Sequence, residues 1–302
     1  MITTKNITLN KLSNILQKTF LIKKDTSKYY NLLNNKILIN AFFEPSTRTS
    51  LSFESAMNRL GGKVINFNKD SSSLKKGESI IDTLKTLENY GDIMVIRHPD
   101  KNIIQNKDKL KIPIINGGNG AGEHPTQALL DFYTIYEKYN FNFENMNNLK
   151  ILFIGDILDS RTVNSLVELL HLFPKMKINI LPYNNQSNAS NELLENINKI
   201  HNQDINNIVI NKNDVDWSKY DVFYVTRMQK ERKVNIDNNM NDIIIDNRNI
   251  NLMKNDAMVM HPLPRNDEIS PDVDHDKRIY YYKQMENGVF IRMSVILDLL
   301  EN

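Results

Sequence analysis

Short apolar runs alternate along the chain with longer segments whose apolar residues recur at spacings of three and four. The short runs are rich in β-branched residues and predict strands at 36–42, 63–68, 92–97, 112–116, 150–155, 177–181, 207–210, 221–225 and 257–261. The longer segments predict helices at 51–60, 80–90, 125–139, 162–172, 191–200 and 289–300. This alternation is typical of an α/β fold with mostly parallel sheets flanked by helices.

A polar, Asn-rich stretch from Phe141 to Asn148 separates two such βα regions. It follows a long predicted helix and precedes a new apolar strand, so we expect one domain over 1–140 and a second over 149–284. The C-terminal segment 285–302 is expected to form a helix that crosses the structure and completes the first domain. A length of 302 residues agrees with two domains of about 150 residues each.

Charge and composition exclude several classes of protein. The chain has 38 Lys and Arg against 36 Asp and Glu, a balance of +2, which gives no basis for general binding to nucleic acid or a membrane surface. The absence of cysteine excludes disulfides, a thiol nucleophile and Cys-ligated metal sites within this chain. No long apolar stretch or targeting pattern occurs, so we expect a cytoplasmic location with no membrane or nucleic-acid partner.

The turn after the first predicted strand is the strongest candidate for chemistry, because ligands of open parallel sheets bind at the carboxyl ends of strands. It reads Ser46-Thr47-Arg48-Thr49 and opens the next helix. Capping of that helix would account for one hydroxyl. An Arg flanked by hydroxyls, beside the free N–H groups of a helix start, favours a phosphate site.

Two further strand ends carry side chains of the same kind. Arg97 ends the strand at 92–97, where an Arg can also be a simple surface charge. His124 and Gln127 flank Pro125 at the start of the helix at 125–139. A helix N-terminus disfavours a charged imidazole, so His124 is suited to donate a hydrogen bond to a carbonyl oxygen, although a purely capping role is the alternative.

The second half of the chain has a different set of polar residues. Arg161 and Arg227 follow two of its predicted strands, and two guanidinium groups at strand ends suit a ligand with two carboxylates. Gly155 lies between a strand and a helix, but no Gly-rich fingerprint follows, so we expect no nicotinamide or flavin cofactor. In the segment 261–265, two prolines stiffen a loop and leave its carbonyls free to accept hydrogen bonds, as a structural turn would also require.

These motifs occur together in an order that resembles the catalytic chains of aspartate carbamoyltransferases over nearly the whole length. The most specific are Ser46-Thr47-Arg48-Thr49, His124-Pro125-Thr126-Gln127, Thr226-Arg227 with Gln229 and Glu231-Arg232, and His261-Pro262-Leu263-Pro264-Arg265. The first two are shared with ornithine carbamoyltransferases. The last two distinguish the families, because ornithine enzymes typically carry a Cys after the His.

The resemblance implies transfer of the carbamoyl group of carbamoyl phosphate to the amine of L-aspartate, giving N-carbamoyl-L-aspartate and phosphate in pyrimidine (UMP) biosynthesis. It implies that the phosphate is held by Ser46, Thr47, Arg48 and Thr49, that Arg97 bridges phosphate and carbonyl, that His124 and Thr49 polarise the carbonyl, and that Gln127 meets the amide. It also implies that aspartate is bound by Arg161, Arg227, Gln229 and the backbone of Pro262 and Leu263.

A homotrimer with shared active sites is a further implication. In this family Lys76 and a serine of the same loop enter the neighbouring subunit's site, where they reach the substrates. Between Ser73 and Lys75 this loop is one residue shorter than the form known in the family. Ser72 and Ser73 are therefore alternatives for the donated serine, and we favour Ser72. Association with zinc-bearing regulatory chains, association with another pyrimidine enzyme and a free trimer all stay open, as do the details of closure in the segment 233–251.

The chemistry needs no covalent intermediate, because carbamoyl phosphate has a good leaving group and the amine can attack a polarised, well-positioned carbonyl. Arg48, Arg97 and Lys76 would offset the charge that develops on the leaving phosphate. No metal or organic cofactor is required, and the sequence contains no ligand cluster for one. Two alternatives are a carbamoyltransferase for ornithine or another amino acid, and a non-catalytic subunit that only binds phosphate or carboxylate.

Overall fold

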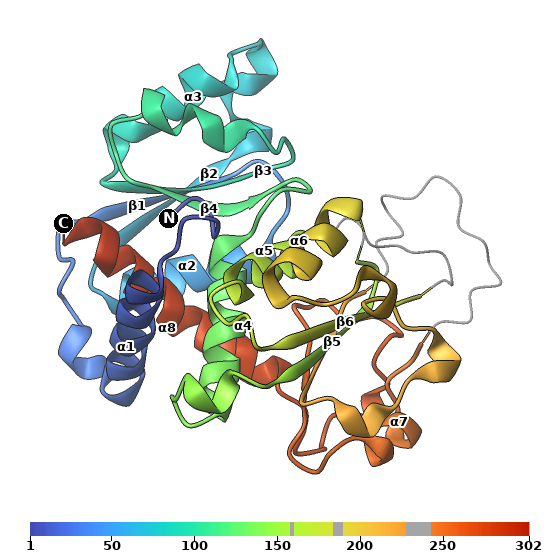
Figure 1. The fold of residues 1–302 in the computed structure, drawn as a ribbon. Coiled ribbons are helices and arrows are strands. Elements are labelled where there is room, and N and C mark those ends of the chain that lie inside the picture. Colours follow the sequence, from blue (N-terminus) through green and yellow to red (C-terminus); the bar gives the residue numbers. More distant parts are fainter. Residues whose placement is uncertain (158–159, 184–189, 228–242, 302) are drawn as a thin grey trace. The chain divides into compact units, whose positions relative to one another are not determined.

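The computed structural model describes residues 1–157, 160–183, 190–227 and 243–301. The chain divides into two units, Met1–Tyr133 with Glu286–Asn302 and Thr134–Met285. It passes from the first unit to the second inside helix α4 (Pro125–Lys138) and returns inside helix α8 (Tyr281–Leu300), as the colours of Figure 1 trace.

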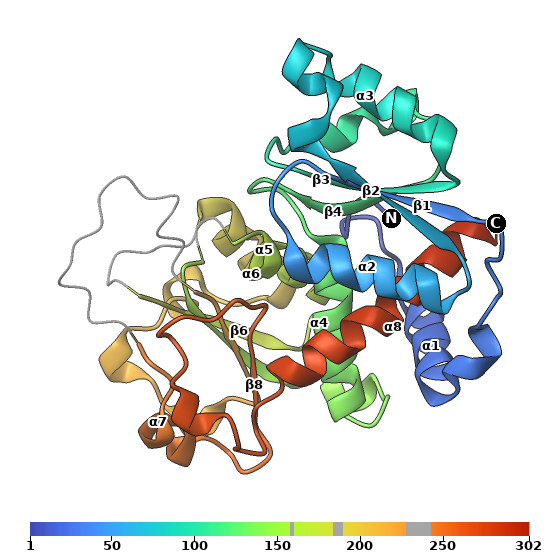
Figure 2. The ribbon, with the colours of Figure 1, turned by 180° about the vertical axis from the view of Figure 1, so that it is seen from behind.

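The first unit is built on a sheet of four parallel strands in the order β2-β1-β3-β4. These are β1 (Ile37–Phe42), β2 (Lys63–Asn68), β3 (Ile93–His98) and β4 (Ile114–Asn119). Its helices are α1 (Leu9–Lys24), α2 (Thr47–Arg59) and α3 (Ile80–Leu87). Helix α3 lies on one face of the sheet and α2 on the other, as both views show (Figures 1 and 2).

The first unit's sheet buries apolar side chains, which is why its strands read as short β-branched runs. Ile39, Met94 and Ile96 belong to a buried cluster that also takes Leu84 and Leu87 from the last turns of α3. Because the strands are parallel, their carboxyl ends lie at one edge of the sheet, where the loops leading to α2 and α4 begin.

The second unit repeats this arrangement with strands in the order β6-β5-β7-β8. The strands are β5 (Lys150–Gly155), β6 (Lys177–Pro182), β7 (Val222–Val225) and β8 (Met258–Met260), and the helices are α5 (Arg161–Leu170), α6 (Asn191–His201) and α7 (Asn247–Leu252). Helices α5 and α6 lie on the face of this sheet opposite α7 (Figure 1). Leu152, Phe223 and Val259 of adjacent strands lie in its buried core.

The predicted α/β class with parallel sheets is confirmed, but one predicted strand is wrong. Residues 207–210 form a single parallel bridge, between Val209 and Ile180. A 3₁₀ turn at Ile205–Asn207 brings the chain in, and only three apolar residues follow it, so the ladder is not extended. Helix α8 also begins at Tyr281, eight residues before its predicted start.

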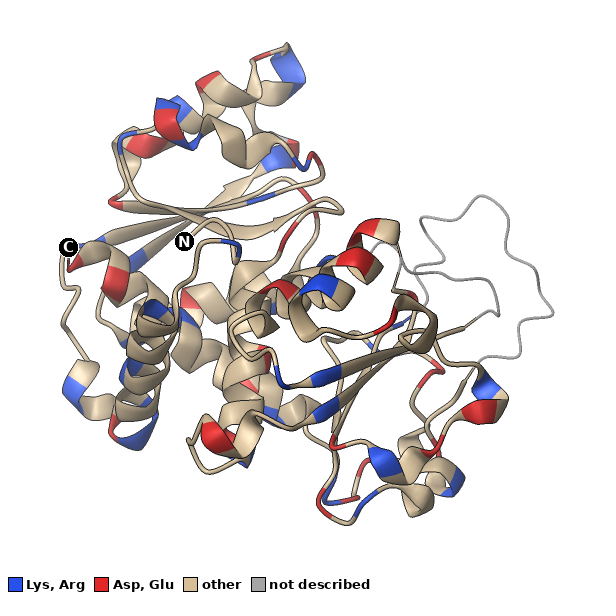
Figure 3. Ribbon diagram, viewed as in Figure 1, with Lys and Arg blue, Asp and Glu red and all other residues tan. Residues whose placement is uncertain are grey.

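Charge is distributed without a dominant sign. Figure 3 shows Lys and Arg interspersed with Asp and Glu along the helices and loops, while the strands are mostly uncharged. This agrees with the formal balance of +2. Within the described ranges, no helix has both the length and the apolar character needed to cross a membrane.

Candidate active site

The turn between β1 and α2 presents the residues predicted to bind phosphate. Ser46 is extended, with φ of −159°, and immediately precedes the first turn of α2. Its hydroxyl makes no capping hydrogen bond to α2, a helix that lies wholly within the described residues. Thr47 and Arg48 are exposed. Since the first N–H groups of a helix lack partners within it, this turn offers backbone donors and a guanidinium group together.

Thr49 and His124 are brought together although 75 residues separate them in the chain. The Oγ1 of Thr49 lies 3.3 Å from the Nε2 of His124, and both side chains are buried. Thr49 comes from the first turn of α2, and His124 directly precedes α4. A hydroxyl and an imidazole held side by side can donate hydrogen bonds to one oxygen on which negative charge develops.

Arg97 lies near the end of β3 in an ion pair with Glu44. The Nε of Arg97 is 2.8 Å from a carboxylate oxygen of Glu44, and Nη1 donates to the Gly117 carbonyl at 3.3 Å. Both side chains of the pair are mostly buried, at 13% and 22% exposure, so the guanidinium plane is fixed from two sides. A fixed plane suits recognition of a flat anionic group, because Arg donates from two nitrogens at once.

Gln127 is oriented by a carboxylate one helical turn further along α4. Its Nε2 donates to Asp131 at 2.8 Å, which leaves the amide oxygen of Gln127 to accept from a ligand. Asp131 is fully buried, and its charge faces Arg292 of α8. Burial lowers the pKa of Arg292 to about 10, an effect that the Asp131 carboxylate opposes.

Lys76 and Ser72 lie on a separate loop of the first unit. Lys76 ends the 3₁₀ turn Ser73–Lys76, is exposed, and forms no ion pair with a residue that the structure describes. Ser72 Oγ donates to the Lys69 carbonyl at 2.7 Å. The hydrogen bonds described for Ser72 and for the Thr49–His124 pair do not link this loop to that pair.

In the second unit, Arg161 is the first residue of α5 and follows β5. The preceding residue, Ser160, caps the helix by accepting a hydrogen bond from the Val163 N–H at 3.4 Å. Arg161 and Arg227 are both half-buried, and they follow β5 and β7, which are neighbours in the sheet. Gln229 lies outside the described residues.

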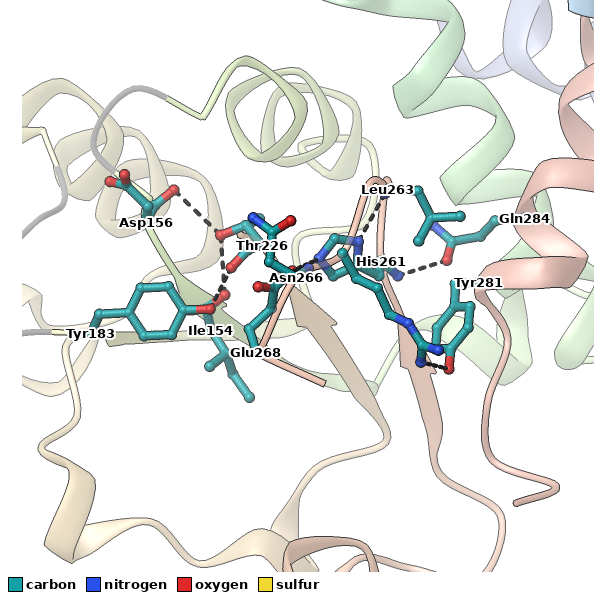
Figure 4. Close-up of polar contacts among 11 residues, drawn as sticks. Ile154, Asp156, Tyr183, Thr226, His261, Leu263, Asn266, Glu268, Tyr281 and Gln284 are labelled. Atoms are coloured by element: carbon teal, nitrogen blue, oxygen red, sulfur yellow. Dashed lines mark hydrogen bonds and ion pairs between the residues drawn. The ribbon is translucent and has the colours of Figure 1, made fainter. Parts of the chain in front are cut away.

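The chain leaves β7 packed tightly against the end of β5, its parallel neighbour in the sheet. Thr226 Oγ1 donates to the Ile154 carbonyl at 3.1 Å, and the Tyr183 hydroxyl donates to the Thr226 carbonyl at 2.7 Å (Figure 4). Gly155 has φ of +118°, and a Cβ there would lie 2.3 Å from the Thr226 carbonyl oxygen. These contacts fix the backbone from which Arg227 begins.

The loop after β8 carries the half-buried Pro262 and Leu263. Leu263 has φ of +55°, a left-handed conformation that costs an L-residue about 1–2 kcal/mol, and the Leu263–Pro264 peptide is cis. His261 is buried and hydrogen-bonded to Leu263, Glu268 and Gln284. The backbone of this loop is therefore held in one conformation by buried side chains.

Four residues of these networks had no predicted role: Glu44, Asp131, Tyr183 and Glu268. Each contacts a residue of a predicted motif through a hydrogen bond or ion pair. No local sequence pattern marks Glu44, Asp131 or Glu268 as functional. Tyr183 carries the one usable signal, because it directly follows the end of β6, where side chains reach the carboxyl edge of the sheet. Among the residues described, no group of three or more His, Asp or Glu side chains is placed to hold a metal ion.

Comparison with known proteins agrees with this arrangement. Residues 1–137 match the aspartate/ornithine carbamoyltransferase carbamoyl-P binding domain, and residues 147–299 match the Asp/Orn binding domain. The chain therefore belongs to the aspartate/ornithine carbamoyltransferase family, a family of carbamoyl-transferring enzymes. An aspartate carbamoyltransferase catalytic subunit from Alkaliphilus metalliredigens is 38% identical over 302 residues, covering 98% of this chain and 94% of that protein.

Two further relatives extend the comparison. The multifunctional protein pyr1-3 of Dictyostelium discoideum is 43% identical over 272 residues, which cover 88% of this chain but only 12% of that protein. The crystal structure of aspartate transcarbamoylase from Trypanosoma cruzi in complex with carbamoyl phosphate and aspartate superimposes with a TM-score of 0.88. Its sequence identity is 36%, and the match covers 99% of this chain and 95% of that one.

Proposed function

We propose that this protein is an aspartate carbamoyltransferase, which transfers the carbamoyl group of carbamoyl phosphate to the amine of L-aspartate in the synthesis of pyrimidines. The observation that carries the proposal is the Thr49–His124 pair, at 3.3 Å, beside the uncapped start of α2. The choice of aspartate is supported by the relatives, which are named for that substrate and one of which was crystallised with it.

Carbamoyl phosphate binds residues of the first unit in this proposal, and the domain concerned is the one expected over 1–140 and 285–302. The phosphate occupies the start of α2, where Ser46, Thr47, Arg48 and Thr49 surround it with hydroxyls, N–H groups and a guanidinium charge. Arg97, fixed by Glu44, reaches both the phosphate and the carbonyl. Gln127, fixed by Asp131, accepts from the carbamoyl amide.

Aspartate binds residues of the domain expected over 149–284. Arg161 and Arg227 each supply a fork of donors for a carboxylate, and Gln229 contributes a side-chain amide. The backbone of Pro262 and Leu263 completes the aspartate site. The hydrogen bonds of Thr226 to Ile154, Asp156 and Tyr183 hold the backbone from which Arg227 extends, which supports a defined position for its guanidinium group.

The proposed reaction is a direct substitution at the carbonyl carbon. The uncharged amine of aspartate attacks that carbon, and the carbonyl oxygen takes up negative charge that His124 and Thr49 stabilise by hydrogen bonds. The bond to the phosphate oxygen then breaks, the proton of the attacking amine passes to the departing phosphate, and phosphate leaves. Arg48, Arg97 and Lys76 offset the charge that moves onto the departing group.

A phosphate-release assay tests the proposal directly. We expect release that requires both carbamoyl phosphate and L-aspartate and that forms N-carbamoyl-L-aspartate in equal amount. L-Ornithine in place of aspartate gives no release above the rate of spontaneous carbamoyl phosphate breakdown. Release with ornithine would instead establish the related enzyme, and binding of carbamoyl phosphate by calorimetry without any release would establish a non-catalytic subunit.

A homotrimer with shared active sites is part of the proposal, supported by the exposed, unpaired position of Lys76 and by the resemblance. Native mass measurement should give three chains. Mixing Lys76→Ala and Arg227→Ala proteins under conditions that exchange subunits should restore part of the activity. Some sites of the mixed trimers then combine an intact Arg227 from one subunit with an intact Lys76 from its neighbour. Absence of recovery, with exchange verified by mass, would contradict sharing.

Location and additional partners complete the proposal. We place the protein in the cytoplasm, and cell fractionation should recover its activity there. If zinc-bearing regulatory chains join the trimers, the complex purified from its source cells will contain a second, smaller chain and bound zinc.

A further inference from the structure

The loop after β8 takes an unfavourable backbone conformation at the place proposed to meet aspartate. Leu263 is a leucine with φ of +55°, in the left-handed region that L-residues with a Cβ rarely adopt. Such a conformation persists only where the surrounding structure holds it. The contacts of His261, two residues earlier, supply this restraint, and Figure 4 shows them.

The hydrogen bonds of the His261 ring define its protonation. Its Nδ1 accepts from the Leu263 N–H at 2.8 Å, which requires that Nδ1 carry no proton. Its Nε2 lies 2.9 Å from a carboxylate oxygen of Glu268, which can only accept. The ring is therefore neutral, with its proton on Nε2, and that proton is donated to Glu268.

Glu268 fixes this state because it is itself buried and tied down. It is 6% exposed, and the same carboxylate oxygen accepts from the Asn266 N–H at 3.0 Å. Burial would raise the pKa of the Glu268 carboxyl, but the hydrogen bonds from His261 and Asn266 outweigh it and hold that pKa below its ordinary value. The backbone N–H of His261 donates to Gln284 at 2.8 Å, which anchors the other side of the residue.

The opposite tautomer would break both ring contacts. With the proton on Nδ1, the ring would present N–H to the N–H of Leu263, and Glu268 would lose its donor. Two hydrogen bonds thus connect three groups: the buried Glu268 carboxylate accepts from the His261 ring, and the ring accepts from the N–H of Leu263. Neither Glu268 nor the His261 ring needs to touch a substrate for the chain to set the direction of the loop's carbonyls.

We propose that His261 is a positioning residue for aspartate, whose Nδ1 holds Leu263 in its left-handed conformation and whose tautomer is set by Glu268. This inference rests on the proposed function, because it takes the Pro262–Leu263 backbone to contact aspartate. The acceptor at Nδ1 therefore governs the KM for aspartate and leaves the KM for carbamoyl phosphate and kcat nearly unchanged.

Two substitutions separate the two ring contacts. In His261→Asn, the side-chain oxygen takes the place of Nδ1 and can accept from the Leu263 N–H, while the contact with Glu268 is lost. In His261→Gln, the longer amide can donate to Glu268 from the place of Nε2, while no acceptor faces Leu263. Steady-state kinetics with both substrates, on each full-length protein, then measures the two contacts separately.

We expect His261→Gln to raise the KM for aspartate by about tenfold, the loss that corresponds to one buried hydrogen bond, with kcat within about twofold of wild type. We expect His261→Asn to keep the KM for aspartate within about twofold, although its thermal stability falls. Equal KM values for aspartate in the two variants, or the reverse order, would overturn the proposal. Wild-type protein without activity toward aspartate would instead refute the proposed function.

A second pair of variants keeps the test decisive if a His261 variant does not fold. Glu268→Gln retains an oxygen that accepts from Nε2, so the KM for aspartate should stay near the wild-type value. Glu268→Leu removes that acceptor, so the tautomer is no longer fixed and the KM for aspartate should rise several-fold. A merely structural role predicts loss of stability in Glu268→Leu with no change of KM, and that result would also overturn the proposal.

Discussion

The first strand-to-helix turn of each unit occupies the same place in its sheet, but the two turns use their serines differently. β1 and β5 are each second in their strand order, and each leads into a helix preceded by a serine. Ser160 caps α5, whereas Ser46 leaves the start of α2 uncapped. In the same topological position, one serine thus stabilises its helix while the other leaves the N–H donors of its helix start for a ligand.

The comparison extends to the buried histidines. His124 of the first unit meets the hydroxyl of Thr49, a candidate catalytic group. His201 of the second unit ends α6, is 1% exposed and has no predicted part in the chemistry. We therefore expect substitution of Ser46 or His124 to change kinetics and substitution of Ser160 or His201 to change stability.

The largest effect should come from His124→Ala. Loss of one donor to a developing oxyanion costs on the order of 10² to 10³ in kcat, so turnover should fall by that factor. Phosphate-release assays at saturating concentrations of both substrates measure this fall in kcat. The exposed His275 provides the control, since His275→Ala should leave kcat unchanged. An unchanged kcat in His124→Ala would remove the proposed role of the imidazole.

Ser46→Ala should act mainly on the binding of carbamoyl phosphate. A hydrogen bond to a charged group contributes about 1.5–3 kcal/mol, so the KM for carbamoyl phosphate should rise roughly 10- to 100-fold. The free energy of unfolding should change little, because the Ser46 hydroxyl makes no capping bond that the substitution could remove. If stability falls while the KM is unchanged, the uncapped helix start is not a ligand site.

His201 should make stability depend on pH. Burial lowers the pKa of His201 from 6.5 to about 4, so the folded protein holds it neutral where the unfolded chain binds a proton. Its stabilising contribution is complete above pH 6.5 and is lost as pH falls toward 4, by about 2 kcal/mol at pH 5. Urea unfolding at pH 7.5 and pH 5 should show a smaller difference in His201→Gln than in wild type; an equal difference would contradict this assignment.

The smallest effect should come from Ser160→Ala. Removing the hydroxyl leaves the Val163 N–H without its capping acceptor, which costs about 1 kcal/mol of unfolding free energy. The KM for carbamoyl phosphate should stay at its wild-type value. Measured beside Ser46→Ala, this variant tests the comparison itself, because a change in the KM for carbamoyl phosphate in both would show that both serines serve the binding of that substrate.

Strand positions were predictable because buried parallel strands are continuous apolar runs. The predicted bounds of β5, in which five of six residues are buried, agree with the structure at both ends. The turns of α8 before residue 289 do not show in the apolar pattern, for the opposite reason. Gln284 and Asn287 are polar but buried, at 2% and 0% exposure. Because the helix pattern counts only apolar residues as buried, it does not identify this face of the helix.

The candidate site divides in the same way. Arg48, Arg97 and His124 were found because charged and polar residues at strand ends stand out in the sequence. Glu44, Glu268 and Tyr183 were not, because their importance depends on partners that only the fold supplies. The Tyr183 hydroxyl reaches the carbonyl of a residue 43 positions away, and no local pattern encodes such a contact.

Gly155 sets a limit on how this fold can diverge. A methyl group at that position would lie 2.3 Å from the backbone carbonyl oxygen of Thr226, far inside van der Waals contact, and no side-chain rotation could relieve the collision. In a saturation library at this codon, only the parental amino acid should survive selection for growth without added uracil. The close approach of Gly155 to Thr226 therefore leaves this position no alternative to glycine.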